Sequence, residues 1–90
     1  MRLTDDDICR GLMERDMDYL AEFVCEYERF MYEAAKKYLG THGKDDVVIS
    51  ECVSNAIIFI WDHIHLYQEE KQSFKTWVGM VVLSMAKKPL

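Results

Sequence analysis

Apolar side chains recur every three or four positions along the middle of this chain, and this spacing constrains the fold most strongly. The residues that keep the spacing are Leu20, Phe23, Val24, Tyr27, Met31, Ala34, Ala35 and Tyr38. Because an α-helix turns once every 3.6 residues, they lie along one face of a helix that starts near Asp18. No strand-like alternation with turn signals occurs elsewhere, so the expected fold is all-α.

A shorter helix is expected before this one, from its capping residues. Thr4 and the acidic run Asp5–Asp7 suit a helix N-terminus, where side-chain oxygens accept hydrogen bonds from unpaired N–H groups and the dipole favours negative charge. This first helix should run to about Glu14. Gly40 follows the long helix, at a point where a left-handed residue can end it, and residues 40–44 are expected to form a loop.

Two more helices complete the expected four-helix bundle. Asp45 or Asp46 opens a third helix that runs to about Leu66, and a polar connector follows. Ser73 then caps a fourth helix, Phe74–Lys87, which stops before the only proline of the chain. Ninety residues give room for a single domain over 1–90 with one modest core.

The last two helices carry more apolar residues than one packing face requires. The core positions expected on them are Val48 or Ile49, Cys52, Val53, Ala56, Ile57, Ile60, Ile64, Phe74, Trp77, Val78, Val81, Val82 and Met85. The surplus residues outside these stripes are Ile58, Phe59, Trp61, Gly79, Met80 and Leu83. Such surplus apolar surface favours contact with a partner.

Charge is distributed unevenly along the sequence. The final twenty residues contain four lysines and no acidic residue, whereas all sixteen Asp and Glu residues precede them. Most of the surface should therefore repel a polyanion such as DNA, and any contact with nucleic acid must be local to the C-terminal end.

The cysteines and the apolar stretches indicate the cellular compartment in which the protein is expected. Cys9, Cys25 and Cys52 are an odd number at wide spacing, without a secretory leader, so we expect reduced thiols in the cytoplasm. The longest apolar stretches, Ala56–Trp61 and Trp77–Leu83, are far shorter than the roughly 20 residues of a membrane span.

Residue patterns for catalysis or metal binding are missing. His63 and His65, two positions apart on a helix, should point about 200° away from each other rather than toward one ion. The acidic pairs at the helix starts are explained by the helix dipole and lack the ligand spacing of a calcium loop. No glycine-rich phosphate loop or His-Glu-x-x-His motif occurs. We therefore expect a binding protein without a metal or cofactor.

Two segments resemble region 2 of the extracytoplasmic-function sigma factors of bacterial RNA polymerase. They are IFIWDHI at 58–64 and YQEEKQSFKTWV at 67–78. In that family a helix ending in Trp leads through a Glu-Glu-Lys loop into a Ser-Phe-basic-x-Trp helix. Residues 6–13 and 16–39 are similar to the first two helices of the family, so the resemblance covers nearly the whole chain and implies a compact four-helix domain.

The resemblance also implies two binding partners. One is RNA polymerase core, whose largest subunit would be contacted through its clamp helices by Glu51, Ser54, Asn55, Ile58 and Asp62. The other is promoter DNA, mainly the single-stranded minus-ten element, which would be contacted by Lys71, Gln72, Ser73, Lys75 and Thr76. Phe74 and Trp77 match family aromatics that we place mainly in the core. A lysine-bearing polar loop suits capture of unstacked bases and a single-stranded backbone.

The sequence departs from the family in the fourth helix. Leu83 and Met85 stand where the family usually has cations, and Phe59 stands at a usually polar position. Each lost phosphate contact should weaken DNA binding and flatten its salt dependence by about one unit of slope. The chain also ends at Leu90, before the linker and second, minus-35-reading domain of a complete family member.

Two alternatives to a promoter-binding module follow from these departures. One is a degenerate sigma-like domain that binds protein, such as an anti-sigma regulator or a second copy of itself, through Phe59, Met80, Leu83 and Met85. The other is an unrelated helical bundle whose stripes only form its core.

Overall fold

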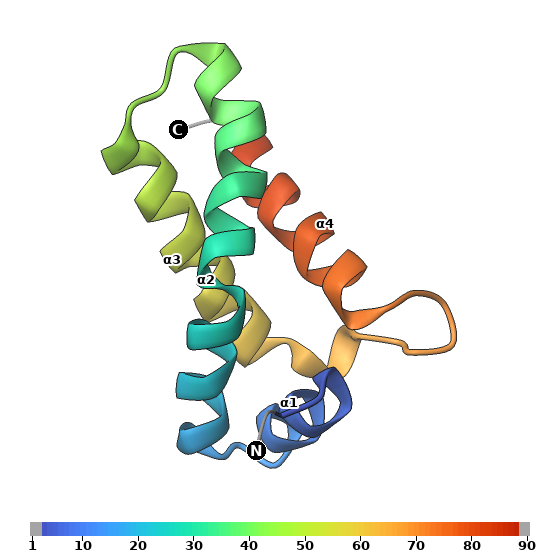
Figure 1. The fold of residues 1–90 in the computed structure, drawn as a ribbon. Helices are drawn as coiled ribbons and strands as arrows, with labels where there is room; N and C mark the ends of the chain where they lie inside the picture. Colours follow the sequence, from blue (N-terminus) through green and yellow to red (C-terminus); the bar gives the residue numbers. More distant parts are fainter. Residues whose placement is uncertain (1–2, 89–90) are drawn as a thin grey trace.

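Four α-helices and two single-turn 3₁₀ helices make up most of residues 3–88, which the computed structural model describes (Figure 1). They are, in chain order, α1 (Asp5–Met13), α2 (Met17–Leu39), η1 (Gly40–His42), α3 (Asp46–Asp62), η2 (Ile64–Leu66) and α4 (Phe74–Lys87). Within these described residues there is no strand, so the all-α prediction is confirmed.

The long helix α2 is the centre of the bundle (Figure 1). It contacts α1, α3 and α4, and α3 and α4 also pack against each other. The short helix α1 lies across one end of α2 and contacts η2. The connection between η2 and α4 projects from the bundle near this end as an open loop (Figure 1).

One hydrophobic cluster fills the space between the helices. Its buried members are Ile8, Cys9, Leu12, Phe23, Tyr27, Met31, Ala35, Leu39, Ile49, Cys52, Val53, Ala56, Ile60, Ile64, Phe74, Trp77, Val78, Val81, Val82 and Ala86. The expected stripes supply most of it, with Ile49 rather than Val48 buried at the start of α3. Met85 is only half-buried. In the part of the chain that is described, no helix has the length and apolar character that crossing a bilayer requires.

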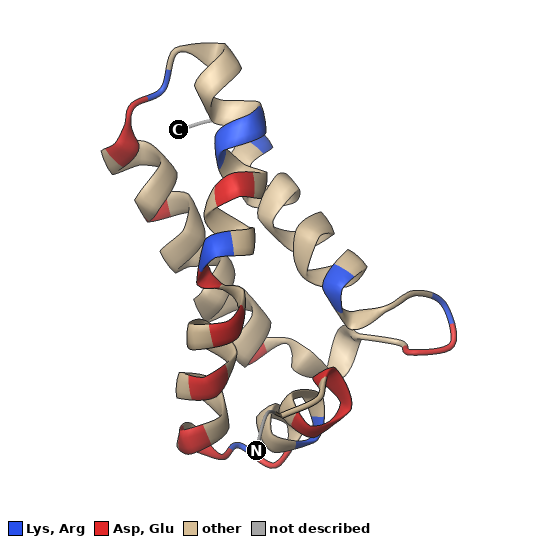
Figure 2. Ribbon diagram, viewed as in Figure 1, with Lys and Arg blue, Asp and Glu red and all other residues tan. Residues whose placement is uncertain are grey.

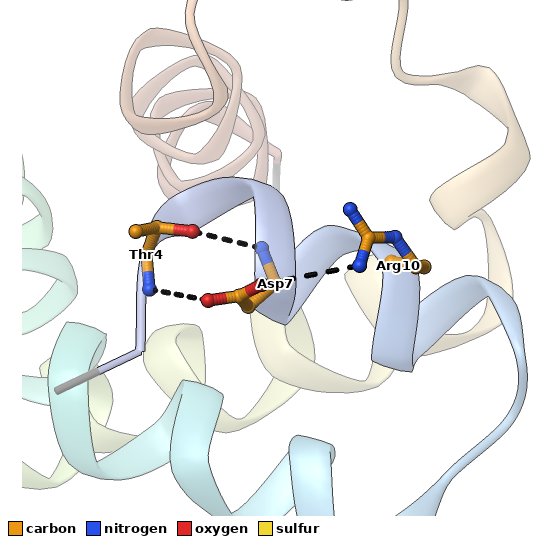
Figure 3. Close-up of polar contacts among 3 residues, drawn as sticks. All are labelled: Thr4, Asp7 and Arg10. Carbon is orange, nitrogen blue, oxygen red and sulfur yellow. Dashed lines mark hydrogen bonds and ion pairs between the residues drawn. The ribbon is translucent and has the colours of Figure 1, made fainter. Parts of the chain in front are cut away.

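The start of α1 is fixed by a reciprocal capping box (Figure 3). The backbone N–H of Asp7 donates to Thr4 Oγ1 at 3.2 Å, and the backbone N–H of Thr4 donates to Asp7 Oδ2 at 3.1 Å. The hydrogen bond from the N–H of Thr4 stabilises the carboxylate and lowers the pKa of Asp7, with smaller contributions from the Thr4 side chain and from Arg10. Two of the otherwise unpaired donors at this helix end are thereby satisfied.

The starts of α3 and α4 are capped as the sequence predicts. Asp45, not Asp46, is the N-cap of α3, where its Oδ1 accepts from the N–H of Val48 at 3.1 Å. The Oγ of Ser73 accepts from the N–H of Thr76 at 3.2 Å. A short polar side chain ahead of each apolar stripe therefore fixes where each helix begins.

The left-handed residue after α2 is Gly43, so the prediction for Gly40 was wrong. Gly40 is helical, with φ −61°, and opens η1. The helical path therefore continues to His42, and Gly43 adopts φ 76°. The N–H of Lys44 then donates to the carbonyl of Leu39 at 3.0 Å, which closes a Schellman-type end. Glycine adopts this conformation without a steric penalty.

The turn between α1 and α2 has the same hydrogen-bond pattern, but its left-handed residue is Arg15 instead of a glycine. Arg15 has φ 61°, and the N–H of Asp16 donates to the carbonyl of Gly11 at 3.0 Å. The left-handed backbone of Arg15 is unfavourable for a residue with a Cβ atom. Its guanidinium lies 3.7 Å from the ring centroid of Trp61 and donates to the carbonyl of Trp61, contacts that offset the strain.

α3 ends at Asp62, four residues before the predicted end near Leu66. Arg15 takes the carbonyl of Trp61 as an acceptor, and His63 leaves the helical conformation with φ −124° and ψ 26°. The helix therefore stops where a side chain from another turn satisfies one of its last carbonyls. Ile64 is nevertheless buried, because η2 returns it to the core.

The close approach of α1 and α2 requires glycine at Gly11. A Cβ atom added at this position would overlap the side chain of Tyr19, at both Cβ and Cγ. The backbone of α1 therefore lies directly against the first turn of α2.

Candidate functional site

The five residues of α3 that were predicted to face a polymerase lie together on one exposed face. Glu51, Ser54, Asn55, Ile58 and Asp62 are all exposed, and at 3.6 residues per turn they occupy an arc of about 100°. The buried residues of α3 lie on the opposite side. Within residues 3–88, the side chains of this stripe therefore do not form part of the buried core.

This α3 stripe combines an aliphatic centre with acidic residues. Ile58 is 58% exposed, and the acidic residues Glu51 and Asp62 stand on either side of it along the helix. Val47, one turn before Glu51, is also exposed. An exposed aliphatic residue between rim charges is an arrangement suited to protein docking, because charges steer encounter and apolar groups hold the complex.

The loop at residues 67–73 is anchored at its base by aromatic packing. The hydroxyl of Tyr67 donates to the carbonyl of Gln72 at 3.0 Å and closes the loop. The ring of Tyr67 lies 5.5 Å from that of Phe74 and 5.6 Å from that of Trp77, between centroids. Phe74 and Trp77 are 3% and 7% exposed, so their expected core position is confirmed.

The residues predicted to contact DNA lie together at the loop and the first turn of α4. Lys71, Ser73, Lys75 and Thr76 are exposed, and Gln72 is half-buried. The Ser73 hydroxyl, which caps α4, also donates to the hydroxyl of Thr76 at 2.9 Å. The Nζ of Lys75 lies 4.9 Å from the ring centroid of Phe30 on α2. Lys71 and Lys75 are therefore the cationic groups of this surface.

Acidic residues lie next to these lysines. Glu69 and Glu70 precede Lys71 in the same loop, and Figure 2 shows the opposite charges side by side at its tip. Glu69 and Glu70 also line a hollow shared with Asp6 and Arg10 of α1. The last twenty residues are free of acids in sequence, but the surroundings of the loop are not. Attraction of the loop for phosphate is reduced accordingly.

Apolar side chains occupy the exposed part of α4 beyond the loop. Met80 is 53% exposed and Leu83 is 38% exposed, whereas Met85 is half-buried. Met80 and Met85 line a mostly apolar hollow together with Phe59 of α3, and Leu83 does not line it. Three of the four residues predicted for a protein-binding face therefore share one hollow.

The two histidines near the end of α3 do not point in opposite directions as predicted. Their ring centroids are 6.0 Å apart, because the helix ends before His63. The ring of His63 stacks on that of Phe59 at 4.2 Å, and its Nδ1 lies 3.1 Å from the carbonyl of Phe59. His65 is exposed. Among residues 3–88, no three His, Cys, Asp or Glu side chains form a group that could hold a metal ion.

Burial protects two of the three cysteine thiols. Burial raises the pKa of Cys9 to about 12, and the carboxylates of Asp5, Asp6 and Glu69 add to the effect. Burial alone raises the pKa of Cys52. Because the thiolate is the reactive form, neither side chain is suited to nucleophilic chemistry.

Sequence reasoning did not identify a pocket with a lysine-bearing rim at the other end of the bundle. It lies between the ends of α2 and α4 and the first half of α3, and its charged residues are Lys44, Glu51, Lys87 and Lys88. These residues come from segments far apart in the sequence, so no local spacing groups them. Lysines at helix C-termini are also explained by the helix dipole alone.

Comparison of the chain with protein-family models, curated protein sequences and solved structures gave no match.

Proposed function

We propose that this chain is a transcription-initiation module that docks on the clamp helices of bacterial RNA polymerase through α3 and contacts the minus-ten element through the 67–73 loop. The proposal starts from the resemblance of residues 58–64 and 67–78 to region 2 of sigma factors. The observation that supports it best is the α3 stripe. All five residues that the motif assigns to polymerase are exposed on one face of a single helix.

The position of the loop also supports this proposal. The loop follows η2, which comes directly after the C-terminal end of α3, so the α3 stripe and the loop belong to adjoining segments of the chain (Figure 1). Tyr67 fixes the base of the loop through its ring contacts and its hydrogen bond to Gln72. Lys71 and Lys75 supply the cationic groups that a single-stranded backbone requires.

Docking is tested first, with isolated clamp helices and the intact chain. Ile58→Ala removes the exposed aliphatic centre of the α3 stripe, and we expect a loss of affinity of about tenfold or more. Met17→Ala is the matched control, because Met17 is also an exposed apolar residue but lies on α2. Fluorescence anisotropy measures both. Equal affinity for parent and Ile58→Ala would contradict the proposed docking face.

DNA contact is tested with a labelled single-stranded minus-ten oligonucleotide, with and without the clamp helices. Lys71→Glu combined with Lys75→Glu should abolish binding, whereas Lys36→Glu with Lys37→Glu changes net charge equally at the end of α2. Equal weakening by both double variants would indicate a general charge effect. Binding of the loop variant as tightly as the parent would exclude the loop as a DNA surface.

A second function, binding of a protein partner without DNA, is favoured by Leu83 and Met85, which stand where cations were expected, and by the exposed Met80. Glu69 and Glu70 beside Lys71 favour it as well, because they reduce the attraction for phosphate. The partner would be an anti-sigma regulator or a second copy of the chain. Salt-insensitive or absent DNA binding, together with self-association in sedimentation, would support this function over the first.

A further inference from the structure

A pocket of about 260 Å³ is lined by residues from the ends of α2 and α4 and the first half of α3. Its floor is apolar: Leu39, Cys52 and Ala86 are buried there, and Val48 and Met85 are half-buried. Sites that enclose a whole drug-sized ligand occupy roughly 300–1,000 Å³. This pocket is smaller and suits one or two inserted side chains.

The rim of the pocket carries an excess of positive charge. Lys44, Lys87 and Lys88 are exposed there, and among the described residues Glu51 is the only acidic one in the lining. Within residues 3–88, no acidic side chain lies within 4.0 Å of the ammonium group of any of these lysines. Their charges are therefore available to an incoming anionic group.

Asp45 and Asp46, at the start of α3, are acidic residues next to Lys44 in the sequence, and neither lines the pocket. Asp45 caps α3, and Asp46 accepts a hydrogen bond from the hydroxyl of Tyr32 at 2.7 Å. The C-termini of α2 and α4 each contribute about half a negative charge, and the N-terminus of α3 contributes about half a positive one. These partial charges are smaller than the excess carried by the rim lysines.

One wall of the pocket is held in place by stacked rings. The rings of Tyr38 and His42 lie 4.3 Å apart, nearly parallel. His42 Nδ1 lies 2.8 Å from the carbonyl of Tyr38, so this nitrogen carries the proton and donates it. The Nζ of Lys87 lies 5.8 Å from the centroid of the same tyrosine ring. The wall is therefore formed before any ligand arrives.

We propose that this pocket binds a short acidic segment of a partner protein, in which an aliphatic or aromatic side chain is flanked by carboxylates. The apolar side chain would fill the floor formed by Leu39, Cys52 and Ala86. The carboxylates would pair with the lysines of the rim. Rim pairs of this kind steer association, and the buried apolar contact gives the complex its lifetime.

A peptide fits these features better than a nucleic acid. A phosphodiester backbone is held by donors and cations, and an apolar floor offers it neither. The proposed site overlaps the proposed polymerase contact only in part. The pocket shares Glu51 and Asn55 with the α3 stripe, but its lysines lie outside that stripe.

Three labelled twelve-residue peptides test the proposal by fluorescence anisotropy with the full chain. The first alternates Leu with Asp and Glu, the second replaces every acid by Lys, and the third keeps the acids but replaces every Leu by Ser. We expect only the first to bind, with an affinity that falls as salt is raised. Equal binding of the first and third peptides would overturn the role of the apolar floor.

The rim is tested with two matched double variants. Lys44→Gln with Lys88→Gln removes two charges from the pocket, and Lys36→Gln with Lys37→Gln removes two exposed charges from the last turn of α2, outside the lining. We expect roughly tenfold weaker peptide binding for the first pair and less than about twofold for the second. Circular dichroism verifies that both remain folded. Equal effects of the two pairs would overturn the proposal.

Two further measurements test whether the pocket instead binds a nucleic acid or a second copy of the chain. A single-stranded oligonucleotide that binds more tightly than the acidic peptide, and loses affinity in the Lys44→Gln, Lys88→Gln variant, would overturn the peptide assignment in favour of nucleic acid. Self-association in sedimentation that the same variant abolishes would overturn it in favour of a second copy. Neither result depends on binding to polymerase, so failure here leaves the proposed function standing.

Discussion

The two ends of the bundle differ in their side chains: one end is held by packed aromatic rings, and the other carries exposed lysines. At the loop end, formed by α1, η2, residues 67–73 and the first turn of α4, the ring of Phe74 packs within 6 Å of the rings of Phe23, Tyr27 and Tyr67. At the basic end, formed by η1 and the last turns of α2 and α4, exposed lysines surround a partly open pocket.

This contrast separates residues that hold the fold from residues that are available for binding. Aromatic rings at the loop end gain most of their stabilisation from mutual burial. Lysines at the basic end remain in water and contribute little to folding. Substitutions at the loop end should therefore lower stability, whereas matched substitutions at the basic end should leave it nearly unchanged.

Phe74→Ala should have the largest effect. Phe74 is 3% exposed, and removal of a buried phenylalanine ring costs about 3–5 kcal/mol. Val48→Ala at the basic end should cost about 1 kcal/mol or less, because Val48 is only half-buried. Urea denaturation followed by circular dichroism measures both. Similar losses for the two variants would remove the distinction between the ends.

Gly11→Ala should destabilise the loop end by about 1–3 kcal/mol, because the added methyl group overlaps the side chain of Tyr19. Gly40→Ala is the matched change at the basic end. Gly40 is helical and its added Cβ would make an ordinary contact with Lys36, so we expect a gain of about 0.4–1 kcal/mol. A shift of the two thermal midpoints in the same direction would contradict the packing described for Gly11.

The two left-handed turn residues sharpen the comparison. Arg15→Ala keeps the strained backbone and removes the contacts with Trp61, so we expect a loss of about 1–2 kcal/mol. Arg15→Gly removes the same contacts but relieves the strain, and should cost about 1 kcal/mol less.

The corresponding change at the other turn is Gly43→Ala. No atom lies within 4 Å of the added methyl group, so only the backbone penalty of about 1 kcal/mol should appear. Chemical denaturation of all three variants provides the measurement. If the Arg15→Gly variant were less stable than the Arg15→Ala variant, the strain at Arg15 would be negligible.

Alkaline pH should give the smallest difference between the ends. The pKa of Cys9 is raised to about 12, so above the ordinary thiol pKa of about 8.5 the unfolded chain loses this proton while the folded protein keeps it. The stability that the protonated Cys9 thiol contributes is therefore fully present below about pH 8.5 and is lost as the pH rises above that value. Burial raises the pKa of Cys52 as well, without neighbouring carboxylates.

We expect Cys9→Ala to flatten the fall in stability between about pH 8.5 and 10 more than Cys52→Ala does. High salt should reduce the contribution of Cys9, because part of its shift comes from Asp5, Asp6 and Glu69. Denaturation at several pH values measures the slopes. A steeper slope after removal of Cys9 would contradict the burial assigned to its thiol.

Features set by neighbouring residues were predictable from the sequence. Thr4 and Ser73 cap α1 and α4 as expected, because capping depends on residues within one turn. The apolar stripe of α2 follows from helical spacing. The predicted loop and α3 residues come from the resemblance to sigma region 2, and their roles in binding remain proposals.

Features set by distant residues were not predictable. α3 ends early because Arg15, from another turn, contacts Trp61. The left-handed residue is Gly43 because η1 prolongs the path of α2, and the residues around Gly40 give no signal of that extension. The basic pocket was missed because Lys44 and Lys88 lie far apart in the sequence.

The contact between Arg15 and Trp61 has a consequence for the order of events during synthesis. The two residues are 46 positions apart, so at about 5–20 residues per second the ribosome adds Trp61 roughly 2–9 s after Arg15. During that interval the turn between α1 and α2 bears its backbone strain without compensation. The nascent first helix therefore lacks this contact until the end of α3 has been synthesised.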